Sequence, residues 1–504
     1  MSQYATHAGV EAFDASRVLF EALVGELAGS DCAGATHGEL EDVLAARSRE
    51  LFCQLMQDHL DLRAQREQRL PEVADVEQVA HGAVETGHTR ALTTVFGQVT
   101  VSRLAYRRRG RVNLYPVDGQ LNLPVEKHSH GLRKFSAVEA ARGSFDDVTD
   151  AIERATGVRM GKRQIEELAS RAAVDFDDFY VQRRAPAGAK QDVLVLSADG
   201  KGIVMRPEAL RPATARAAAD STTKLATRLS KGEKRNRKRL AEVGAVYDAQ
   251  PVVRTPADIL ARTDNIDDAQ PAEAPVAVNK WLTASVTDDA ATVIGCLFDE
   301  AHRRDPNHVR TWIALVDGNN HQIDRIHTEA GKRGADVTIL CDFIHVLEYL
   351  WKAAWSFHNE GDPAAEEWVR DKATAVLQGK ASHVAAGIRR AATRRSLNPT
   401  RRASADTCAT YLTNKASYLD YPTALHNGWP IATGVIEGAC RHLIKDRMDI
   451  TGARWGLTGA EAILKLRAIR SNGHFNEYWR YHLTQERHRV HETRYRNGTI
   501  PQAA

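Results

Sequence analysis

The sequence predicts an α/β core with parallel strands, an all-α insertion in that core, and a mainly helical region before it. Three observations support this class. Short apolar runs alternate with helical segments over residues 190–358, helical residues without strand signals fill 359–430, and apolar residues recur at three- and four-residue spacing over 1–90. The composition, 43% hydrophobic and 26% charged residues in a chain of 504, is globular and excludes a disordered or fibrous protein.

Two regions are predicted before the core. Residues 1–90 are expected to be helical, and no chemistry is assigned to them. Residues 91–184 begin with alternating apolar runs and many Arg, which together predict a basic hairpin. Two helices are then expected, over 145–155 and 162–173, with a turn at Gly157 between them.

These two helices have the pattern of a helix-turn-helix motif. In that motif the second helix presents its N-terminal residues to the major groove of DNA. The residues in that position here are Lys162 and Arg163. An ordinary αα-hairpin has the same pattern, so the pattern alone leaves both interpretations open.

The core is expected to begin with a strand over 192–199 and to continue with a strand over 240–248. A helix is predicted over 281–298, although its start is mixed in character. Two more buried strands, over 311–317 and 337–342, are each followed by helical residues. Strands that alternate with helices indicate a sheet with parallel members.

The net charge of +3 says little about partners, but the positive charge is concentrated in two places. Residues 206–240 hold eleven Lys or Arg against three acids, and a group of six Arg lies between 389 and 402. Such clusters attract polyanions, because each neutralised phosphate releases a counterion. A solvated helix face is the alternative for either cluster, but two clusters favour nucleic acid. We expect 206–240 to be an insert that orders on DNA, with phosphate contacts from Lys234, Arg235, Arg237, Lys238 and Arg239.

Other features of the sequence concern its compartment. The chain has no run of about 18 apolar residues, and its start lacks the basic and apolar regions of a secretory signal. Its six cysteines form no CxxC pair. These features predict a cytoplasmic protein with neither a membrane span nor a disulfide framework.

Two predicted strands of the core end in Asp-Gly, at Asp199 and Asp317. Burying an unpaired carboxylate costs on the order of several kcal/mol, so an Asp at the end of a buried strand needs a reason. Ligand sites of α/β sheets lie at the carboxyl ends of strands, and converging carboxylates suit a divalent cation such as Mg²⁺. The alternative is that each Asp caps the turn or helix that follows it.

A third carboxylate, Glu437, lies on a helix predicted over 436–446. Arg441 and Lys445 follow at i+4 and i+8 on the same helix face, where they would bind phosphates while Glu437 binds metal. A surface ion pair is the alternative. Asp342 and His345 share one helical turn after the third buried strand, and they are predicted to support the metal site or orient DNA, with helix capping as the alternative.

Five stretches of the chain resemble bacterial insertion-sequence transposases of the ISKra family, distant relatives of the Mutator-like transposases. They are SADGKG (197–202), AEVGAVYDAQPVVRTP (241–256), VDGNNHQ (316–322), CDFIHVLEYLWKAAW (341–355) and GVIEGACRHLIKDRMDITGARWGL (434–457). The similarity covers about 190–480 and, more loosely, 92–184, but not 1–90. The last two stretches are fairly specific together, whereas SADGKG alone is not.

The resemblance implies a catalytic core of RNase H-like type with a DDE triad, matched here by Asp199, Asp317 and Glu437. Such a triad holds two Mg²⁺ ions, for which Mn²⁺ substitutes. The family's Cys-or-Asp-x-x-His motif matches Asp342 and His345. Because Asp342 also follows a strand, it competes with Asp317 as the second metal ligand, and the order of the motifs favours Asp317.

The implied activity is that of a DNA transposase, which binds terminal inverted repeats and catalyses Mg²⁺-dependent DNA cleavage and strand transfer. Its partners would be double-stranded DNA of the element's ends and of the target, bound by a homo-oligomer in the bacterial cytoplasm at the nucleoid, without a membrane. One alternative is an RNase H-like nuclease or resolvase without strand transfer. The other is a non-catalytic DNA-binding regulator derived from a transposase.

The expected domain boundaries follow from these assignments. The helical N-terminal region precedes a basic hairpin and helix-turn-helix region, and the core is divided by the all-α insertion. The regions are 1–90, 91–184, 190–358 with its basic insert 206–240, the insertion 359–430, the segment of the catalytic Glu helix 431–458, and C-terminal helices 459–504.

Overall fold

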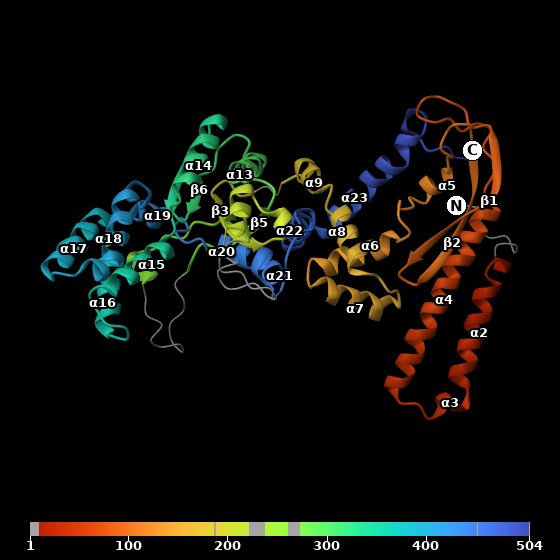
Figure 1. Ribbon diagram of the computed structural model, residues 1–504, viewed down its shortest axis with the longest axis horizontal. Coiled ribbons are helices and arrows are strands. Elements are labelled where there is room, and N and C mark those ends of the chain that lie inside the picture. The colour runs from red at the N-terminus through yellow and green to blue at the C-terminus, as the bar shows by residue number, and fades with distance from the viewer. Residues whose placement is uncertain (1–9, 186–187, 221–236, 261–272, 451, 503–504) are drawn as a thin grey trace. The chain divides into compact units, whose positions relative to one another are not determined.

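The computed structural model describes residues 10–185, 188–220, 237–260, 273–450 and 452–502. The chain forms two compact units, which are described separately (Figure 1). Unit 1 comprises Met1–Val181 and His474–Ala504, and unit 2 comprises Gln182–Gly473. The predicted C-terminal region 459–504 is therefore divided between the two units.

Unit 1 is mostly helical and contains one β-hairpin. Its helices are α2 (Asp14–Ala28), α3 (Ser30–Ala33), α4 (His37–Gln65), α5 (Pro116–Gln120), α6 (His130–Ala140), α7 (Phe145–Thr156), α8 (Lys162–Ala172), α9 (Phe176–Gln182, which reaches the boundary with unit 2) and α23 (Phe475–Val490). Strands β1 (Ala83–Thr94) and β2 (Gly97–Arg107) pair antiparallel. The predicted helices and hairpin are confirmed, but the hairpin begins at Ala83 rather than at 91.

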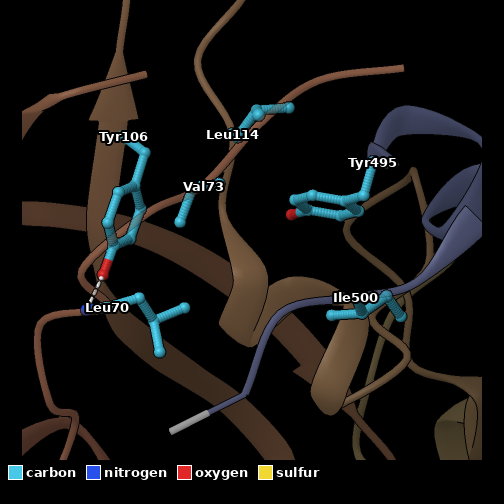
Figure 2. Packing of buried hydrophobic residues seen from close by; sticks show 6 residues of the cluster. All are labelled: Leu70, Val73, Tyr106, Leu114, Tyr495 and Ile500. Carbon is cyan, nitrogen blue, oxygen red and sulfur yellow. Dashed lines mark hydrogen bonds between the residues drawn. The ribbon is translucent and has the colours of Figure 1, made fainter. Parts of the chain in front are cut away.

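Two apolar clusters hold the hairpin in place. The first joins α4 to both strands through Leu60, Leu92, Val99, Val101 and Leu123. The second, in Figure 2, consists of Leu70, Val73, Tyr106, Leu114, Tyr495 and Ile500. In it, the Tyr106 hydroxyl accepts a hydrogen bond of 2.7 Å from the Leu70 amide. Residues from the end of the chain therefore complete the apolar core around β2.

The helix-turn-helix pattern is present as α7 and α8. The Ser144 hydroxyl caps α7 by accepting from the Asp147 amide, and Gly157 adopts a left-handed φ of 70° at the turn. The cations expected to contact DNA have acidic neighbours on the same two helices: Lys162 pairs with Asp146, and Arg163 pairs with Glu167 at 3.2 Å. Both side chains are exposed, so both cations are accessible despite these pairs.

Unit 2 is built on a five-stranded mixed sheet in the order β5-β4-β3-β6-β7. Figure 1 labels β3, β5 and β6 of this sheet. The strands are β3 (Val193–Val204), β4 (Lys238–Ala249), β5 (Ala277–Ser285), β6 (Trp312–Val316) and β7 (Val337–Cys341). Pairing of β3 with β4 and of β4 with β5 is antiparallel, whereas β3 with β6 and β6 with β7 are parallel. The predicted parallel members are therefore β3, β6 and β7, and the first three strands form an antiparallel meander.

The prediction of a helix over 281–298 is wrong for the first part of that range. Residues Ala277–Ser285 form β5, and the helix α13 (Ala290–Arg304) begins only after Asp289 caps it with a 2.9 Å hydrogen bond from the Thr292 amide. The physical reason is that β5 finds a partner in the long strand β4, which satisfies its backbone groups. Pairing of this kind overrides local periodicity.

Helices cover both faces of the sheet. On one face, α13 packs against β3 and β4. Gly244 of β4 permits this close approach, because a Cβ there would lie only 2.6 Å from the Leu297 side chain. On the other face, α20 (Gly434–Ala439) lies against β3 and β4, and α22 (Leu457–Ser471) lies against β5.

The all-α insertion is confirmed as a helical segment after β7. Figure 1 shows α16, α17 and α18 grouped beside α15. The bounds in this part of unit 2 are α14 (Asn320–Arg333), α15 (Phe343–Ala354), α16 (Pro363–Leu377), α17 (Ala381–Arg394), α18 (Pro399–Asn414), α19 (Tyr421–His426) and α21 (Asp446–Met448), with the short helices α10 (Pro212–Ala219) and α12 (Pro256–Ile259) earlier in the chain. The middle of the predicted basic insert, residues 221–236 with Lys234 and Arg235, lies outside the described residues.

A buried network of charges ties α23 into unit 1. Arg133 of α6 donates to Glu486 at 2.6 Å, and the two ring nitrogens of His482 lie 2.6 Å from Asp175 and 3.2 Å from Glu486. Arg489 adds hydrogen bonds of 2.9 and 3.1 Å to both oxygens of Asp175. Burial would raise the pKa of Glu486, but hydrogen bonds from His482 and Arg133 outweigh burial and hold this pKa at about 2.

We predict that Glu486→Gln destabilises unit 1 by about 1.5–3 kcal/mol at neutral pH, because Gln removes the buried carboxylate that Arg133 and His482 share. Glu126, 3.0 Å from Nε of Arg133, remains as the second acid at that guanidinium. Hydrogen exchange of α6 and α23 amides measures this loss. The pKa of Glu486 is lower in the folded state than its ordinary 4.5, so its contribution is complete above that pH and disappears as the pH falls toward about 2. The wild type and the variant should therefore converge in acid.

The matched control is Glu167→Gln, which makes the same change at an exposed ion pair in unit 1. Exposed pairs contribute about 0–1 kcal/mol, so this variant should keep nearly wild-type protection. Equal effects of the two substitutions would contradict a stabilising role for the buried network.

Candidate functional site

Three aspartates lie at the same level along one edge of the sheet. The parallel register places Ser197 opposite Leu315 and Val316 opposite Cys341. Continued along the strands, this register places Asp199 level with Asp317, and Asp317 level with Asp342. Asp199 does not end its strand as predicted, because pairing with β4 extends β3 to Val204, but the three carboxylates share one row across β3, β6 and β7.

Asp317 is the exposed member of this row. One carboxylate oxygen, Oδ1, accepts a 2.8 Å hydrogen bond from the Asn319 amide, and the backbone carbonyl accepts a 3.1 Å hydrogen bond from the Tyr411 hydroxyl. Gly318 makes the turn after the strand with a φ of 93°, a value that favours glycine. Within the described part of the chain, Oδ2 has no hydrogen-bond donor, so it is available to a ligand.

Asp342 is buried, with 2% of its surface exposed, and its two oxygens are already engaged. Oδ1 caps α15 by accepting from the Ile344 amide at 2.9 Å, and Oδ2 accepts from the Thr433 hydroxyl at 2.5 Å. Burial raises the pKa of Asp342, and the hydrogen bond from Thr433 offsets part of that rise. The helix-capping alternative considered from the sequence is thus present at this position.

Glu437 lies on α20, in a segment that contacts two of the aspartates. The Thr433 hydroxyl that donates to Asp342 also lies 3.4 Å from Oε1 of Glu437. One turn after Glu437, the Cys440 thiol lies 3.3 Å from Oδ2 of Asp199. Because the residues before and after Glu437 reach Asp342 and Asp199 respectively, Glu437 is held at the aspartate row.

The helix that carries Glu437 changes its geometry directly after this contact. Residues Cys440–Lys445 form a π-helix, whose turns are wider than those of an α-helix. The prediction that Arg441 and Lys445 share the face of Glu437 assumes α-helical spacing, which does not apply through this π-helical turn. Both side chains are exposed, and the Arg441 guanidinium lies 3.9 Å from Asp446.

The donor set at the aspartate row is the kind that Mg²⁺ prefers, because carboxylate oxygens are hard ligands. Among the described residues, no three His, Cys, Asp or Glu side chains already stand in a metal-binding arrangement. Asp199 uses Oδ1 to accept a 2.7 Å hydrogen bond from the Gly200 amide, and Oδ2 faces the weakly donating Cys440 thiol. Asp199, Asp317 and Glu437 therefore fit an oxygen-liganded cation, whereas both oxygens of Asp342 are occupied.

His345, predicted to support the site, lies on the first turn of α15. Its ring meets those of Tyr349 and Tyr411 edge-on, with centroids 5.2 and 5.9 Å away. Nδ1 lies 3.9 Å from a carboxylate oxygen of Glu348. The described contacts of His345 are thus aromatic and acidic side chains of α15 and α18.

The basic residues at the start of β4 differ in how they are used. Arg239 donates to the Val286 carbonyl at 2.7 Å and to the Ala209 carbonyl at 3.3 Å, and burial lowers its pKa. Lys238 is exposed, and Arg237 is half-buried. Arg239 therefore braces the end of β5, a structural role that its place in a charged run did not indicate.

Sequence reasoning missed four residues at or near the row: Thr433, Cys440, Tyr411 and Glu242. Thr433 precedes Glu437 by four residues, a spacing that places both on one helix face and was readable from the sequence. Glu242 is a buried carboxylate within the apolar run of β4; it pairs with Gly200, so it faces away from Asp199. Burial raises its pKa, and the charge of Arg211 opposes that rise. Tyr411 reaches Asp317 from the insertion, which no local pattern reveals.

Comparison with known proteins adds no family. No described protein family matches the chain, and no curated protein is detectably similar to it. Across the ranges that the structure describes, no helix combines the length and apolar character required to cross a membrane.

We predict that Thr433→Val destabilises unit 2 by about 1.5–3 kcal/mol at neutral pH, because buried Asp342 loses a hydrogen bond to its charged carboxylate. The folded-state pKa of Asp342 is already raised, so ionised Asp342 lowers stability as pH rises through that pKa. Loss of the Thr433 donor raises this pKa further, and the deficit should grow from acid to neutral pH. Urea unfolding at several pH values measures it.

The control is Thr433→Ser, which keeps the hydroxyl and removes one methyl group. It should cost about 1 kcal/mol, the scale of one buried methyl group, with little added pH dependence. If the Val and Ser variants have the same stability at all pH values, the hydrogen bond from Thr433 to Asp342 does not contribute to the stability of unit 2.

Proposed function

We propose that this protein is a DNA transposase that cleaves the ends of a mobile element and joins them to target DNA. The row of Asp199, Asp317 and Asp342 with Glu437 held against it carries this proposal. Asp342 has both oxygens hydrogen-bonded, but Asp199, Asp317 and Glu437 offer further carboxylate oxygens along this row. Divalent cations that act on phosphodiesters take such oxygen ligands.

The order of the elements supports the same proposal. In the transposases that the sequence resembles, the first Asp ends the first strand of the core, the second ends the fourth strand, and the Glu opens a late helix after an all-α insertion. Here Asp199 lies on β3, the first strand of the sheet in chain order, Asp317 follows β6, the fourth, and Glu437 follows α16–α19. This correspondence favours an RNase H-like core.

The residues at such a site have different roles. Asp199, Asp317 and Glu437 supply oxygen ligands, and bound Mg²⁺ would supply charge stabilisation and activation of the attacking oxygen. Asp342, with both oxygens hydrogen-bonded, serves as the brace that positions Thr433 and, through it, Glu437. Exposed Arg441 and Lys445 follow Glu437 and are available to bind phosphates of the DNA backbone.

We expect Glu437→Gln to abolish Mg²⁺-dependent cleavage and strand transfer while binding of the element's end DNA persists. Gln has nearly the shape of Glu but no negative charge, so the helix packs as before and the cation loses a ligand. The rate should fall by several orders of magnitude, since about 1.4 kcal/mol of barrier corresponds to a tenfold change. A cleavage assay, a joining assay with a free 3′-hydroxyl end, and a gel shift measure the three activities.

Glu366→Gln, on the exposed surface of α16, is the matched control and should cleave normally. Cleavage without joining by the wild type would indicate a nuclease or resolvase instead. DNA binding without either activity, unchanged in Glu437→Gln, would indicate a regulator.

A second prediction concerns the basic insert. Replacing Lys224, Arg228, Lys231, Lys234 and Arg235 with Gln should weaken binding to DNA of any sequence. The slope of log affinity against log salt should fall by up to about 4–5, because each lost phosphate contact removes about 0.9. Filter binding at several salt concentrations measures the slope, and an unchanged slope would show that these cations do not contact phosphates.

A further inference from the structure

An aromatic cluster stands directly beside the aspartate row. Tyr349 of α15 and Tyr411 of α18 stack with their ring centroids 4.2 Å apart and their planes inclined by 19°. His345 approaches both rings edge-on. All three rings are only half-buried, so the cluster is part of the surface.

One hydrogen bond fixes the distance between this cluster and the carboxylates. The Tyr411 hydroxyl donates to the backbone carbonyl of Asp317 at 3.1 Å, while the Asp317 side chain faces the proposed cation. His345 and Tyr349 lie on α15, whose first turn is capped by Asp342. A polymer held at the aspartates therefore passes within a side chain's reach of the stacked rings.

The charge around the cluster suits a polyanion. The Lys352 ammonium lies 5.4 Å from the centre of the Tyr349 ring and is largely exposed, and Glu348, 3.4 Å from it, is the acid on the same helix surface. Arg389 of α17 donates to the hydroxyls of Thr410 and Thr413, which flank Tyr411 on α18. Arg390 and Arg394 lie on α17, and Arg401 and Arg402 lie on α18, where Arg402 pairs with Asp406 at 2.8 Å. Arg395 follows α17 and donates to the Phe357 carbonyl at 2.8 Å.

We propose that Tyr349, Tyr411 and His345 form a stacking platform for an unpaired base of the DNA strand at the aspartate row. This proposal rests on the proposed function and specifies its substrate further, as DNA with a frayed end. A base within a duplex has both faces covered, so only an unpaired base has a free face for an aromatic side chain. Aromatic rings flanked by cations are the usual means of holding single strands, and they tolerate any base.

The test compares two DNA probes on the full-length chain, with EDTA present to prevent cleavage. One probe is a blunt duplex, and the other is a duplex of the same length with one end forked by unpaired thymidines. Stacking on aromatic side chains is worth a preference of about tenfold to a hundredfold for the forked probe. Tyr349→Leu should remove this preference and leave blunt-duplex affinity unchanged, whereas Tyr349→Phe, which keeps the ring, should retain it.

A second measurement needs no substitution. When 2-aminopurine replaces the first unpaired base, its fluorescence should change on binding more than that of 2-aminopurine at the far end of the duplex. Equal affinity of the wild type for both probes, or a preference that survives in Tyr349→Leu, would overturn the platform. If Tyr349→Leu lowered the affinity for both probes equally, the platform would also be overturned, because Tyr349 would then have a structural role.

The two proposals fail in different ways. If the wild type cleaves and joins duplex DNA but does not prefer the fork, the platform is wrong and the proposed function stands. If the wild type binds neither probe, the proposed function fails and the platform fails with it.

Discussion

The hydrogen bond between Thr433 and Asp342 closes the insertion at its base, and the position of Glu437 depends on it. The backbone supports the same closure, since the Phe343 amide donates to the Ile431 carbonyl at 2.9 Å. The chain thus leaves the sheet at β7, builds α16–α19, and returns to within hydrogen-bond distance of its point of departure. Because Asp342 is buried, losing its partner costs more than the same hydrogen bond would at the surface. The helix that carries Glu437 can therefore join the sheet in only a narrow range of positions.

The row of aspartates shows how differently three chemically identical side chains behave. Asp317 is exposed with one oxygen free, Asp199 is half-buried beside a thiol, and Asp342 is buried with both oxygens hydrogen-bonded. These differences arise from what covers each aspartate rather than from the strands themselves. They favour Asp317 over Asp342 as a cation ligand. The order of the motifs in the sequence also favours Asp317, but it carries no information on which carboxylate oxygens are free.

Local signals in the sequence were enough to predict most elements of this fold. The strands that precede Asp317 and Asp342, the helical insertion and the helix pair around Gly157 depend on neighbours within a few residues, and these predictions are confirmed as secondary structure. The predicted end of the first strand at Asp199 is wrong, because pairing with β4 extends β3 to Val204. Strand β5 was misassigned because its stability comes from pairing with β4. The contact of Tyr411 with Asp317 and the pairing of Arg133 with Glu486 join residues far apart in the chain, where periodicity and spacing carry no information.

The assembly of unit 1 from two distant parts of the chain also has a consequence during synthesis. Residues 474–504 leave the ribosome after all of unit 2, yet they supply His482, Glu486 and Tyr495 to the interior of unit 1. Until then Asp175 lacks His482 and Arg489, Arg133 has only Glu126 of its two carboxylate partners, and the apolar cluster around Tyr106 is incomplete. Unit 2 is continuous in the chain and has no such delay. The nascent chain would therefore acquire its carboxylate-bearing unit before the unit with the hairpin and the helix pair is stable, which makes α23 the element on which the stability of unit 1 waits.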